Sequence, residues 1–408
     1  MSNLGTWARK LVRAVFFTGG LAGSLAMTAT DGPADPQRVE ALVSPAPVGA
    51  HLPRVTSNVA GEVFLSWVEK RGDADALVFA RHDQSSWADS ETIAEGTNWF
   101  VNWADFPRLS VRGDTQLAHW LQRSGEGRYD YDVMLSFKTA SDSDWSPGTV
   151  LNTDGVLAEH GFVGMTTMGA KQTLITWLDG RRTKDRPAAG PMTLRGAVYT
   201  EAGPAVAEWE LDGRVCDCCQ TAAAMTARGP VVLYRDRSPE EIRDIAIVRQ
   251  IDGRWTAPQT VHDDGWQVRG CPVNGPSVSA RGEGLAVAWY TGSEDLPKVN
   301  LVVSHDAGAT FTPPVLVSDA NTIGRVDTTI LENGDYVVSY LDSDGPNAWI
   351  RLARYSPTAE WIESVDVAET VSSRRSGMPD IEAVGNTVYV TWTAVGETTG
   401  VEVARVRF

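Results

Sequence analysis

Basic residues are scarce in this 408-residue chain, which has 36 Lys and Arg against 52 Asp and Glu and a formal net charge of −16. A surface with this excess of negative charge repels polyphosphate, so we expect neither nucleic acid nor an anionic membrane as a partner. Long apolar runs are also rare, because beyond residue 29 no stretch approaches the length of a membrane span. The bulk of the chain is therefore expected to be a soluble protein.

The first 29 residues are the exception, and they have the features of an export signal. Their three charges are all basic: Arg9, Lys10 and Arg13. An apolar stretch rich in small residues follows, and then the polar segment TDGPADPQ, so we predict a signal peptide over residues 1–29, cleaved between Ala26 and Thr30. An uncleaved membrane anchor is the alternative. Cleavage would leave 33 basic residues (36 minus 3) against 52 acidic ones in a periplasmic or secreted protein without a membrane span.

A helical pattern is missing too, and short strands with a long repeat take its place. Apolar strands that end in an aromatic residue recur seven times with nearly constant spacing, at Trp67, Trp120, Trp177, Tyr234, Trp289, Tyr340 and Trp392. A fixed period of this length, built from strands, indicates a β-propeller. A two-sheet sandwich would not explain seven aromatic residues in register.

The rest of each unit supplies the other strands of a propeller blade. One short strand precedes the aromatic strand, as in PRLSV and PSVSA, and a third follows it after a polar loop, as in IAIVRQ and VNLVVS. We predict an all-β, seven-bladed β-propeller over residues 30–408 with four-stranded antiparallel blades, or six blades if one unit is a loop. The last unit stops at Phe408 after its third strand, so the N-terminal segment RVEALVS, residues 38–44, is expected to close the ring.

The fifth unit contains a turn with a recognisable pattern, SHDAGATF, at residues 304–311. It resembles the Asp-box, Ser-x-Asp-x-Gly-x-Thr-aromatic, of sialidase-like (BNR repeat) propellers. In such a turn the aspartate accepts backbone N–H bonds, the glycine supplies a positive φ, and the aromatic ring packs between sheets. The matching residues are Ser304, Asp306, Gly308, Thr310 and Phe311.

The resemblance implies a glycan-directed protein, either a glycoside hydrolase or a carbohydrate-binding protein. An active sialidase of this superfamily carries three arginines for the substrate carboxylate, a tyrosine nucleophile with a glutamate, and an aspartate as acid and base. The Arg-Ile-Pro signature of the family is absent, and the corresponding segment from Leu52 to Val55 reads LPRV. The arginine triad and the nucleophile therefore cannot be assigned by motif, and enzyme activity stays open.

Propellers bind ligands where their innermost strands enter the central channel, so the residues just before each first strand are candidate site residues. Alignment of the units on the aromatic strand gives two candidate catalytic carboxylates, Asp105 and Asp327. Four arginines are candidates for binding a glycan or a small anionic ligand: Arg54, Arg108, Arg325 and Arg375. The alternative is that these arginines are solvated or paired with neighbouring aspartates.

Cysteine is the scarcest reactive residue, with 4 in the chain, and three of them fall in the segment VCDCCQTA. Cys216 lies 18 residues before Tyr234, and Cys271 lies 18 residues before Trp289. Because Tyr234 and Trp289 hold the same place in neighbouring units, the two cysteines are expected at equivalent places in adjacent blades, at the mouth of the channel.

Three interpretations of the cysteines remain open: structural disulfides, a metal site, and inert thiols. A Cys216–Cys271 disulfide would join adjacent blades and leave Cys218 and Cys219 as a vicinal pair or free thiols. Alternatively, the four cysteines with His160, expected nearby, could bind Cu or Zn. A redox-active pair cannot be separated from these two. The sequence thus supports two hypotheses: a glycan-directed propeller, and a periplasmic metal-binding or redox protein.

Overall fold

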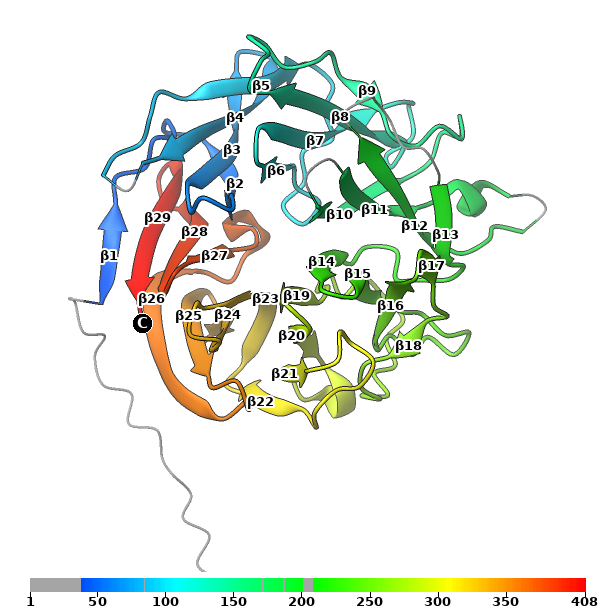
Figure 1. Cartoon of the computed structure of the whole chain (residues 1–408). Helices are drawn as coiled ribbons and strands as arrows, with labels where there is room; N and C mark the ends of the chain where they lie inside the picture. The colour runs from blue at the N-terminus through cyan, green and yellow to red at the C-terminus, as the bar shows by residue number, and fades with distance from the viewer. Residues whose placement is uncertain (1–37, 84, 170–171, 186–187, 201–207) are drawn as a thin grey trace, which may run out of the picture. The chain divides into compact units, whose positions relative to one another are not determined.

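The computed structural model describes residues 38–408 apart from positions 84, 170–171, 186–187 and 201–207. The predicted signal peptide, residues 1–29, lies outside the described residues. The described residues form one compact unit, a ring of seven antiparallel sheets around a central axis (Figure 1). The predicted seven-bladed propeller is therefore confirmed, and the six-bladed alternative is wrong.

Each blade is a sheet whose first strand lies at the axis (Figure 1). The first three blades comprise β2 His51–Ser57, β3 Val63–Arg71, β4 Ala74–His82 and β5 Glu91–Gly96; β6 Arg108–Arg112, β7 Thr115–Arg123, β8 Tyr131–Thr139 and β9 Thr149–Val150; and β10 His160–Met168, β11 Gln172–Asp179, β12 Thr193–Thr200 and β13 Glu208–Asp212. The fourth and fifth comprise β14 Ala222–Thr226, β15 Gly229–Arg235, β16 Ile245–Ile251 and β17 Arg254–Trp255, with β18 Gln259–Thr260 also paired to β16; and β19 Ser277–Arg281, β20 Gly284–Thr291, β21 Lys298–Ser304 and β22 Val315–Ser318. The last two comprise β23 Thr322–Ile330, β24 Tyr336–Ser343, β25 Asn347–Tyr355 and β26 Trp361–Val371; and β27 Asp380–Val384, β28 Thr387–Val395, β29 Thr399–Arg407 and β1 Val39–Leu42.

The ring is closed by the N-terminal strand, as the sequence predicts. β1 pairs with β29 in antiparallel register, with Val39 opposite Val406 and Leu42 opposite Val403. The seventh blade thus combines strands from both ends of the chain (Figure 1). Because β1 covers the outer edge of β29, the blade does not end in a bare three-stranded sheet.

The seven repeat aromatics occupy the second strand of every blade and are all buried. Trp67, Trp177 and Trp289 are the largest fully buried side chains of the described residues. Their indole N–H groups are satisfied by carboxylates, for example from Trp177 to Asp179 at 2.9 Å and from Trp289 to Asp264 at 2.6 Å. The period of the sequence is therefore the spacing of large side chains that fill the layers between neighbouring sheets.

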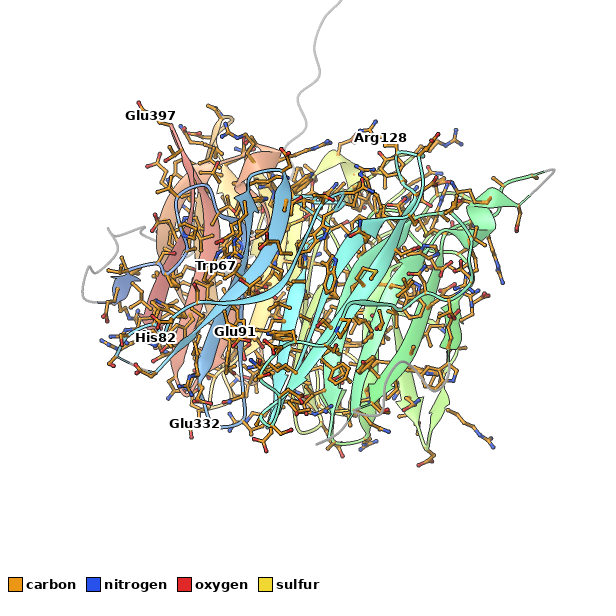
Figure 2. The ribbon with its side chains drawn as sticks, turned by 90° about the horizontal axis from the view of Figure 1, so that it is seen from above. Trp67, His82, Glu91, Arg128, Glu332 and Glu397 are labelled. Carbon is orange, nitrogen blue, oxygen red and sulfur yellow. A yellow bond between two sulfur atoms is a disulfide. The ribbon has the colours of Figure 1, made fainter. Side chains whose placement is uncertain are left out.

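The alternating strand directions give the ring two different faces. Connections between blades and loops between second and third strands lie on one face, and the remaining turns lie on the other. Figure 2 shows Arg128 and Glu397, from loops of the first kind, on the side opposite Glu332, which lies in the turn between β23 and β24. We call the face of Arg128 and Glu397 the mouth face, because the chain enters every innermost strand from it.

The turn that resembles an Asp-box connects β21 to β22, so it lies on the face opposite the mouth. Asp306 accepts hydrogen bonds from the Thr310 N–H at 2.8 Å, the Thr310 hydroxyl at 2.7 Å and the Ser304 hydroxyl at 2.8 Å. The Gly308 N–H donates to the Ser304 oxygen at 2.8 Å, and Gly308 has a φ of +81°. Phe311 packs against buried residues of the fourth and fifth blades. This turn is a structural element away from the channel mouth.

Helical structure in the described part of the chain is limited to three short 3-10 turns: η1 Arg181–Lys184, η2 Ser293–Asp295 and η3 Arg374–Ser376. None of the described residues belongs to a helix long and apolar enough to cross a bilayer.

Candidate functional site

The central channel contains a small cavity lined by residues from all seven blades. Its volume is about 100 Å³, and Arg54, Arg108, Arg325, Asp327 and Asp380 are among its charged lining residues. A second cavity, of about 210 Å³, shares Arg54, Arg108, Asp327 and Asp380 with the first. It also includes residues further along the innermost strands, so the two cavities follow each other down the channel. Three of the four arginines predicted from the sequence meet here.

Arg54, on β2, is buried with only 5% of its surface exposed. One terminal nitrogen donates to Asp380 at 2.8 Å, and the guanidinium lies 3.2 Å from the centroid of the Phe106 ring. Burial lowers the pKa of Arg54 to about 10, so the group stays charged at neutral pH. Its Nε and Nη2 atoms have no hydrogen-bond partner in the described part of the chain. Arg54 therefore contributes a buried positive charge whose hydrogen-bonding capacity is only partly used.

Arg108 opens β6 and is the most accessible charged group of the cavity wall, with 35% of its side chain exposed. It lies 3.9 Å from Asp380 and stacks over the same Phe106 ring, at 5.1 Å from its centroid. Among the described residues it makes no hydrogen bond, so its donors are available to a ligand in the channel. Arg54 and Arg108 together form a fixed cationic pair on one aromatic ring.

Arg325 lines the cavity, but its hydrogen bonds hold the chain in place. It donates to the carbonyl oxygens of Ser372, Ser373 and Gly377 at 2.9 to 3.1 Å and to the Ser376 hydroxyl at 2.6 Å. These hydrogen bonds hold the segment that carries η3 in place, and they use both terminal nitrogens of Arg325.

Arg375 lies within η3, is exposed, and does not line either channel cavity. The structure therefore brings Arg54, Arg108 and Arg325 together and leaves Arg375 outside the cavity. Arg54 and Arg108 both line the cavity with donors that make no hydrogen bond among the described residues, and of these two Arg108 is the more exposed, with 35% of its side chain accessible against 5% for Arg54.

Asp327, one of the two predicted catalytic carboxylates, connects three neighbouring blades. It accepts hydrogen bonds from the Ser277 hydroxyl at 2.7 Å in the fifth blade and from the Ile381 N–H at 2.9 Å in the seventh. Burial and the nearby charge of Asp380 raise the pKa of Asp327 to about 6. Asp380 has the same kind of contact, since it accepts from the Val55 N–H at 2.8 Å in the first blade.

The same kind of contact between adjacent blades recurs elsewhere around the axis, with an amide oxygen as the acceptor in place of a carboxylate. Gln220 accepts from the Gly275 N–H, and Asn274 accepts from the Arg325 N–H, each at 2.8 Å. A side-chain oxygen at the start of one blade thus satisfies a backbone donor of the next. These contacts assign Asp327 a role in blade packing, and its catalytic role stays a prediction.

Asp105, the other predicted carboxylate, is fully buried and belongs to a network that the sequence does not reveal. It accepts from the Phe162 N–H at 2.7 Å and from the Tyr131 hydroxyl at 3.0 Å. The same hydroxyl lies 2.9 Å from Glu159. One hydroxyl proton cannot serve two carboxylates, so one carboxyl must carry a proton of its own.

The pKa values in this network agree with a shared proton. Burial raises the pKa of Asp105 to about 8, against hydrogen bonds from Phe162 and Tyr131 that lower it. Burial likewise raises the pKa of Glu159 to about 7. Tyr131 lies on the third strand of its blade, outside the segments before first strands, so no signal in the sequence points to it.

His160 does not lie with the cysteines. Its Nδ1 is 3.1 Å from the Tyr131 carbonyl oxygen, and its Nε2 is 3.0 Å from Asp154. Burial alone would lower its pKa, but hydrogen bonds with Asp132 and Asp154 and the charge of Asp179 outweigh burial and raise the pKa to about 10. The neighbours of the ring nitrogens are thus carboxylates and a backbone carbonyl oxygen, and the predicted grouping of His160 with the cysteines is not what the structure assembles.

The cysteines do gather at the mouth, in the connections that precede β14 and β19. The structure has a disulfide between Cys216 and Cys219, with a Cα–Cα distance of 5.9 Å, and leaves Cys218 and Cys271 as free thiols. The Cys216–Cys271 disulfide considered from the sequence is therefore not formed. Cys218 and Cys271 contact each other, and burial and this contact raise the pKa of Cys218.

Comparison with known proteins adds information on the fold. No protein-family model matches the chain, and no curated protein matches its sequence. A protein of unknown function from Dyadobacter fermentans matches with a TM-score of 0.54 and 12% identity over 91% of this chain and 98% of its own. The polysaccharide lyase Uly1 matches with a TM-score of 0.51 and 11% identity over 94% and 95%.

A puromycin-hydrolyzing peptidase from Mycobacterium tuberculosis also matches, with a TM-score of 0.51 and 15% identity over 89% of this chain. The aligned region is 54% of the peptidase chain. At these identities the likeness establishes the fold that the proteins share. The chain is thus a seven-bladed β-propeller with a charged axial channel.

Proposed function

We propose that the protein is exported and that its channel mouth binds a glycan with a negatively charged substituent. The observation that carries the proposal is Arg108, a partly exposed guanidinium in the cavity wall without a hydrogen bond of its own among the described residues. It lies beside the buried Arg54 on the Phe106 ring. A planar guanidinium with free donors suits a carboxylate or sulfate, which can accept two parallel hydrogen bonds.

The small volume of the two channel cavities limits which part of a glycan can enter them. Cavities of about 100 and 210 Å³ are smaller than sites that enclose drug-sized ligands, which are about 300 Å³ or larger. We infer that the acidic substituent enters the channel, whereas the sugar rings lie across the mouth face. Such binding suits a chain end or side group of a polysaccharide.

The shared fold of a named polysaccharide lyase, Uly1, and the Asp-box-like turn support a glycan as the ligand class. Hydrolysis is a narrower form of the same proposal. Asp105 and Asp327 remain the candidate acid–base groups, and Glu159 joins them because a carboxyl with a pKa of about 7 can donate a proton near neutral pH. Binding without hydrolysis is the form that the free donors of Arg108 support directly.

Binding can be tested with three oligosaccharides of equal length: an oligouronate, a sulfated oligosaccharide and a neutral one. Calorimetry should show binding of an acidic ligand and at least tenfold weaker binding of the neutral one. Arg108→Gln should lower the affinity for the acidic ligand by about 10- to 100-fold. This loss corresponds to about 1.5–3 kcal/mol, the contribution expected of hydrogen bonds to a charged group.

Arg128→Gln is the matched control, because Arg128 is exposed on the same face but outside the channel cavities. Arg375 was predicted from the sequence as a binding residue but does not line either cavity. We therefore expect Arg375→Gln to bind the acidic ligand normally. Equal affinity for acidic and neutral ligands, or normal binding by Arg108→Gln, would contradict the proposal. For export, protein recovered from outside the cytoplasm should have its first residue between positions 27 and 30.

A further inference from the structure

The cysteine cluster takes no part in the proposed glycan site. Cys216, Cys218 and Cys219 lie in one connection between the third and fourth blades, and their sulfur atoms are all within 4.8 Å of one another. Cys216 and Cys219 are each 1% exposed, and Cys218 is half-buried against the largest hydrophobic cluster. Three sulfurs thus converge at a nearly dry place beside the channel mouth.

The spacing of these sulfurs suits a single metal ion with three ligands. With metal–thiolate bonds of about 2.3 Å, the three sulfurs of a trigonal centre lie about 4 Å apart. All three sulfurs already lie within 4.8 Å of one another, and opening of the Cys216–Cys219 disulfide would free two of them to separate to that spacing. Sulfur ligands without any carboxylate or imidazole among them select soft ions, and three thiolates suit Cu⁺.

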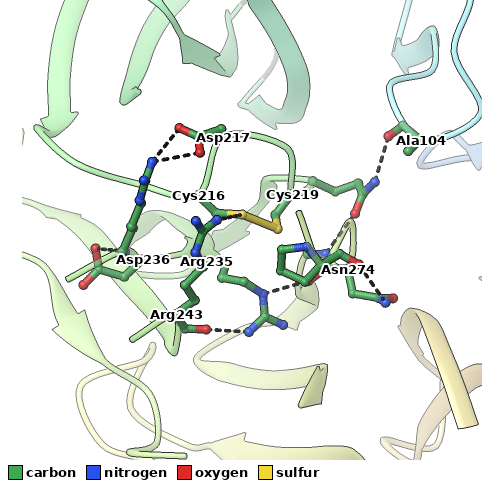
Figure 3. The surroundings of a disulfide bond; sticks show 12 residues. Ala104, Cys216, Asp217, Cys219, Arg235, Asp236, Arg243 and Asn274 are labelled. Atoms are coloured by element: carbon green, nitrogen blue, oxygen red, sulfur yellow. Dashed lines mark hydrogen bonds and ion pairs between the residues drawn. A yellow bond between two sulfur atoms is a disulfide. The ribbon is translucent and has the colours of Figure 1, made fainter. Parts of the chain in front are cut away.

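Arg243 supplies the second, independent observation. Its side chain is 3% exposed, and Nη1 points at the Cys216 sulfur at a distance of 3.3 Å (Figure 3). Nη2 is satisfied by Glu241 at 2.8 Å, whereas Nε has no hydrogen-bond partner among the described residues. Glu241 balances the charge of Arg243, but a disulfide sulfur is a weak acceptor for the Nη1 donor. A thiolate at Cys216 would be a stronger acceptor, so the position of Nη1 suits a deprotonated, metal-bound sulfur.

Cys271 approaches the cluster from the connection that precedes the fifth blade. It is exposed, and its thiol contacts that of Cys218. It is not one of the three mutually close sulfurs. Because Cys271 is the exposed cysteine, an ion arriving from solvent can bind its thiol first. Transfer of the ion from Cys271 to Cys218 would then bring it to the buried sulfurs of the cluster.

We propose that Cys216, Cys218 and Cys219, when reduced, bind one Cu⁺ ion, and that the Cys216–Cys219 disulfide is the oxidised, metal-free form of this site. Reduction takes two electrons and two protons from an external dithiol, which becomes a disulfide, and yields the Cys216 and Cys219 thiols. Binding of Cu⁺ then releases the protons of the three coordinating thiols. The resulting site carries a net charge of −2, beside the cation of Arg243.

The whole protein, reduced under argon, can be titrated with Cu⁺ in competition with a chromogenic Cu⁺ chelator. We expect one tightly bound Cu⁺ per chain, and a fall in reactive thiols from four to one as Cu⁺ binds. Cys216→Ser, Cys218→Ser and Cys219→Ser should each weaken binding at least tenfold. Cys271→Ser is the matched control and should retain the affinity, with slower uptake.

Arg243→Gln keeps every ligand and should still weaken Cu⁺ binding, so it tests the site even if a cysteine variant fails to fold. Thermal unfolding of each variant separates loss of fold from loss of the site. Two results would overturn the proposal. One is Cu⁺ affinity that is unchanged in Cys216→Ser; the other is tight Zn²⁺ binding that needs Cys271, which would indicate a four-thiolate site. Neither result bears on glycan binding by Arg108.

Discussion

Two carboxyl groups buried near the axis have pKa values raised into the neutral range. Burial raises the pKa of Asp105 to about 8 and, on the innermost strand of the seventh blade, that of Glu382 to about 7. In the unfolded chain such groups lose their protons near pH 4. The folded protein therefore binds more protons than the unfolded one between about pH 4 and pH 8. The stability that these groups contribute is complete below pH 4, declines as the pH rises, and is fully lost once the pH has passed the folded-state pKa values of about 7 and 8.

Asp105→Asn tests this linkage. The asparagine oxygen can still accept the Phe162 N–H, but the titrating proton is gone. A single such group makes the free energy of unfolding fall by up to about 1.4 kcal/mol per pH unit in the window between its two pKa values. Urea unfolding from pH 5 to pH 8 should therefore show a shallower decline for Asp105→Asn than for the unaltered protein.

Asp263→Asn provides the control, because Asp263 is exposed. It should leave the pH dependence unchanged. If Asp105→Asn declined with the same slope as the unaltered protein, Asp105 would have to be ionised in the folded state at these pH values.

Which residues could be foreseen depended on where they lie in the repeat. Arg54, Arg108, Asp105 and the cysteines lie just before or at the start of first strands, a position that the repeat identifies. Tyr131 lies on a third strand and Arg243 in a loop after a second strand, so only the folded chain brings them to Asp105 and Cys216. The partners of Arg325 and His160 were equally hidden, because backbone carbonyls and distant aspartates leave no pattern in the sequence.

Among the elements, the turn of residues 304–311 was predicted in detail because its hydrogen bonds are local. Its donors and acceptors lie within six residues of one another, so their spacing in the sequence specifies them. The contacts between blades differ: Asp327 reaches Ile381 only when two sheets meet in the correct register. The sequence therefore indicates the strands and the turn, whereas the side-chain bridges that hold neighbouring strands at the axis require the structure.

Asp306→Ala should destabilise this turn, because it leaves the Thr310 N–H and two hydroxyl groups without their acceptor. We expect a loss of about 1–3 kcal/mol in the free energy of unfolding, measured by denaturant titration. Glycan binding should not change, since the turn lies on the face opposite the mouth.

The exposed Asp319, beyond the end of β22, offers a control of the same residue type in the same blade. Asp319→Ala should alter the free energy of unfolding by no more than about 0.5 kcal/mol. Equal effects of Asp306→Ala and Asp319→Ala would mean that the turn contributes nothing beyond an ordinary surface loop.

At the scale of the whole molecule, the number of blades and the closure of the ring followed from one count, seven aromatic strands with a missing fourth strand in the last unit. The seven sheets confirm the number of blades, and the pairing of β1 with β29 confirms the closure. Neither the dimensions of the channel nor the pairing of the cysteines follows from such a count. They depend on how far seven sheets approach the axis and on the conformation of the connections between them.

Ala41→Pro tests the importance of closure. Proline within β1 disturbs its pairing with β29 and leaves the edge of the seventh blade open. The melting temperature should fall, by the equivalent of about 1–3 kcal/mol, and light scattering should reveal association through the open edge.

Val43→Pro places the same residue two positions later, outside β1, and should behave like the unaltered protein. If Ala41→Pro melted at the same temperature as Val43→Pro, the ring would not depend on its N-terminal strand.

The register of β1 and β29 also determines how the molecule responds to tension. The first residue of β1, Val39, lies opposite Val406, next to the end of the chain. A force applied between the two termini therefore acts on the terminal pair first and separates the strands one pair at a time, as in unzipping. The contacts of Arg38 with Arg407 and Glu363 lie at this same end, and the ion pairs from Arg405 and Arg407 to Glu40 follow directly, so these contacts would break early. The structure that completes the ring is thus the place where a pull on the chain ends would open it.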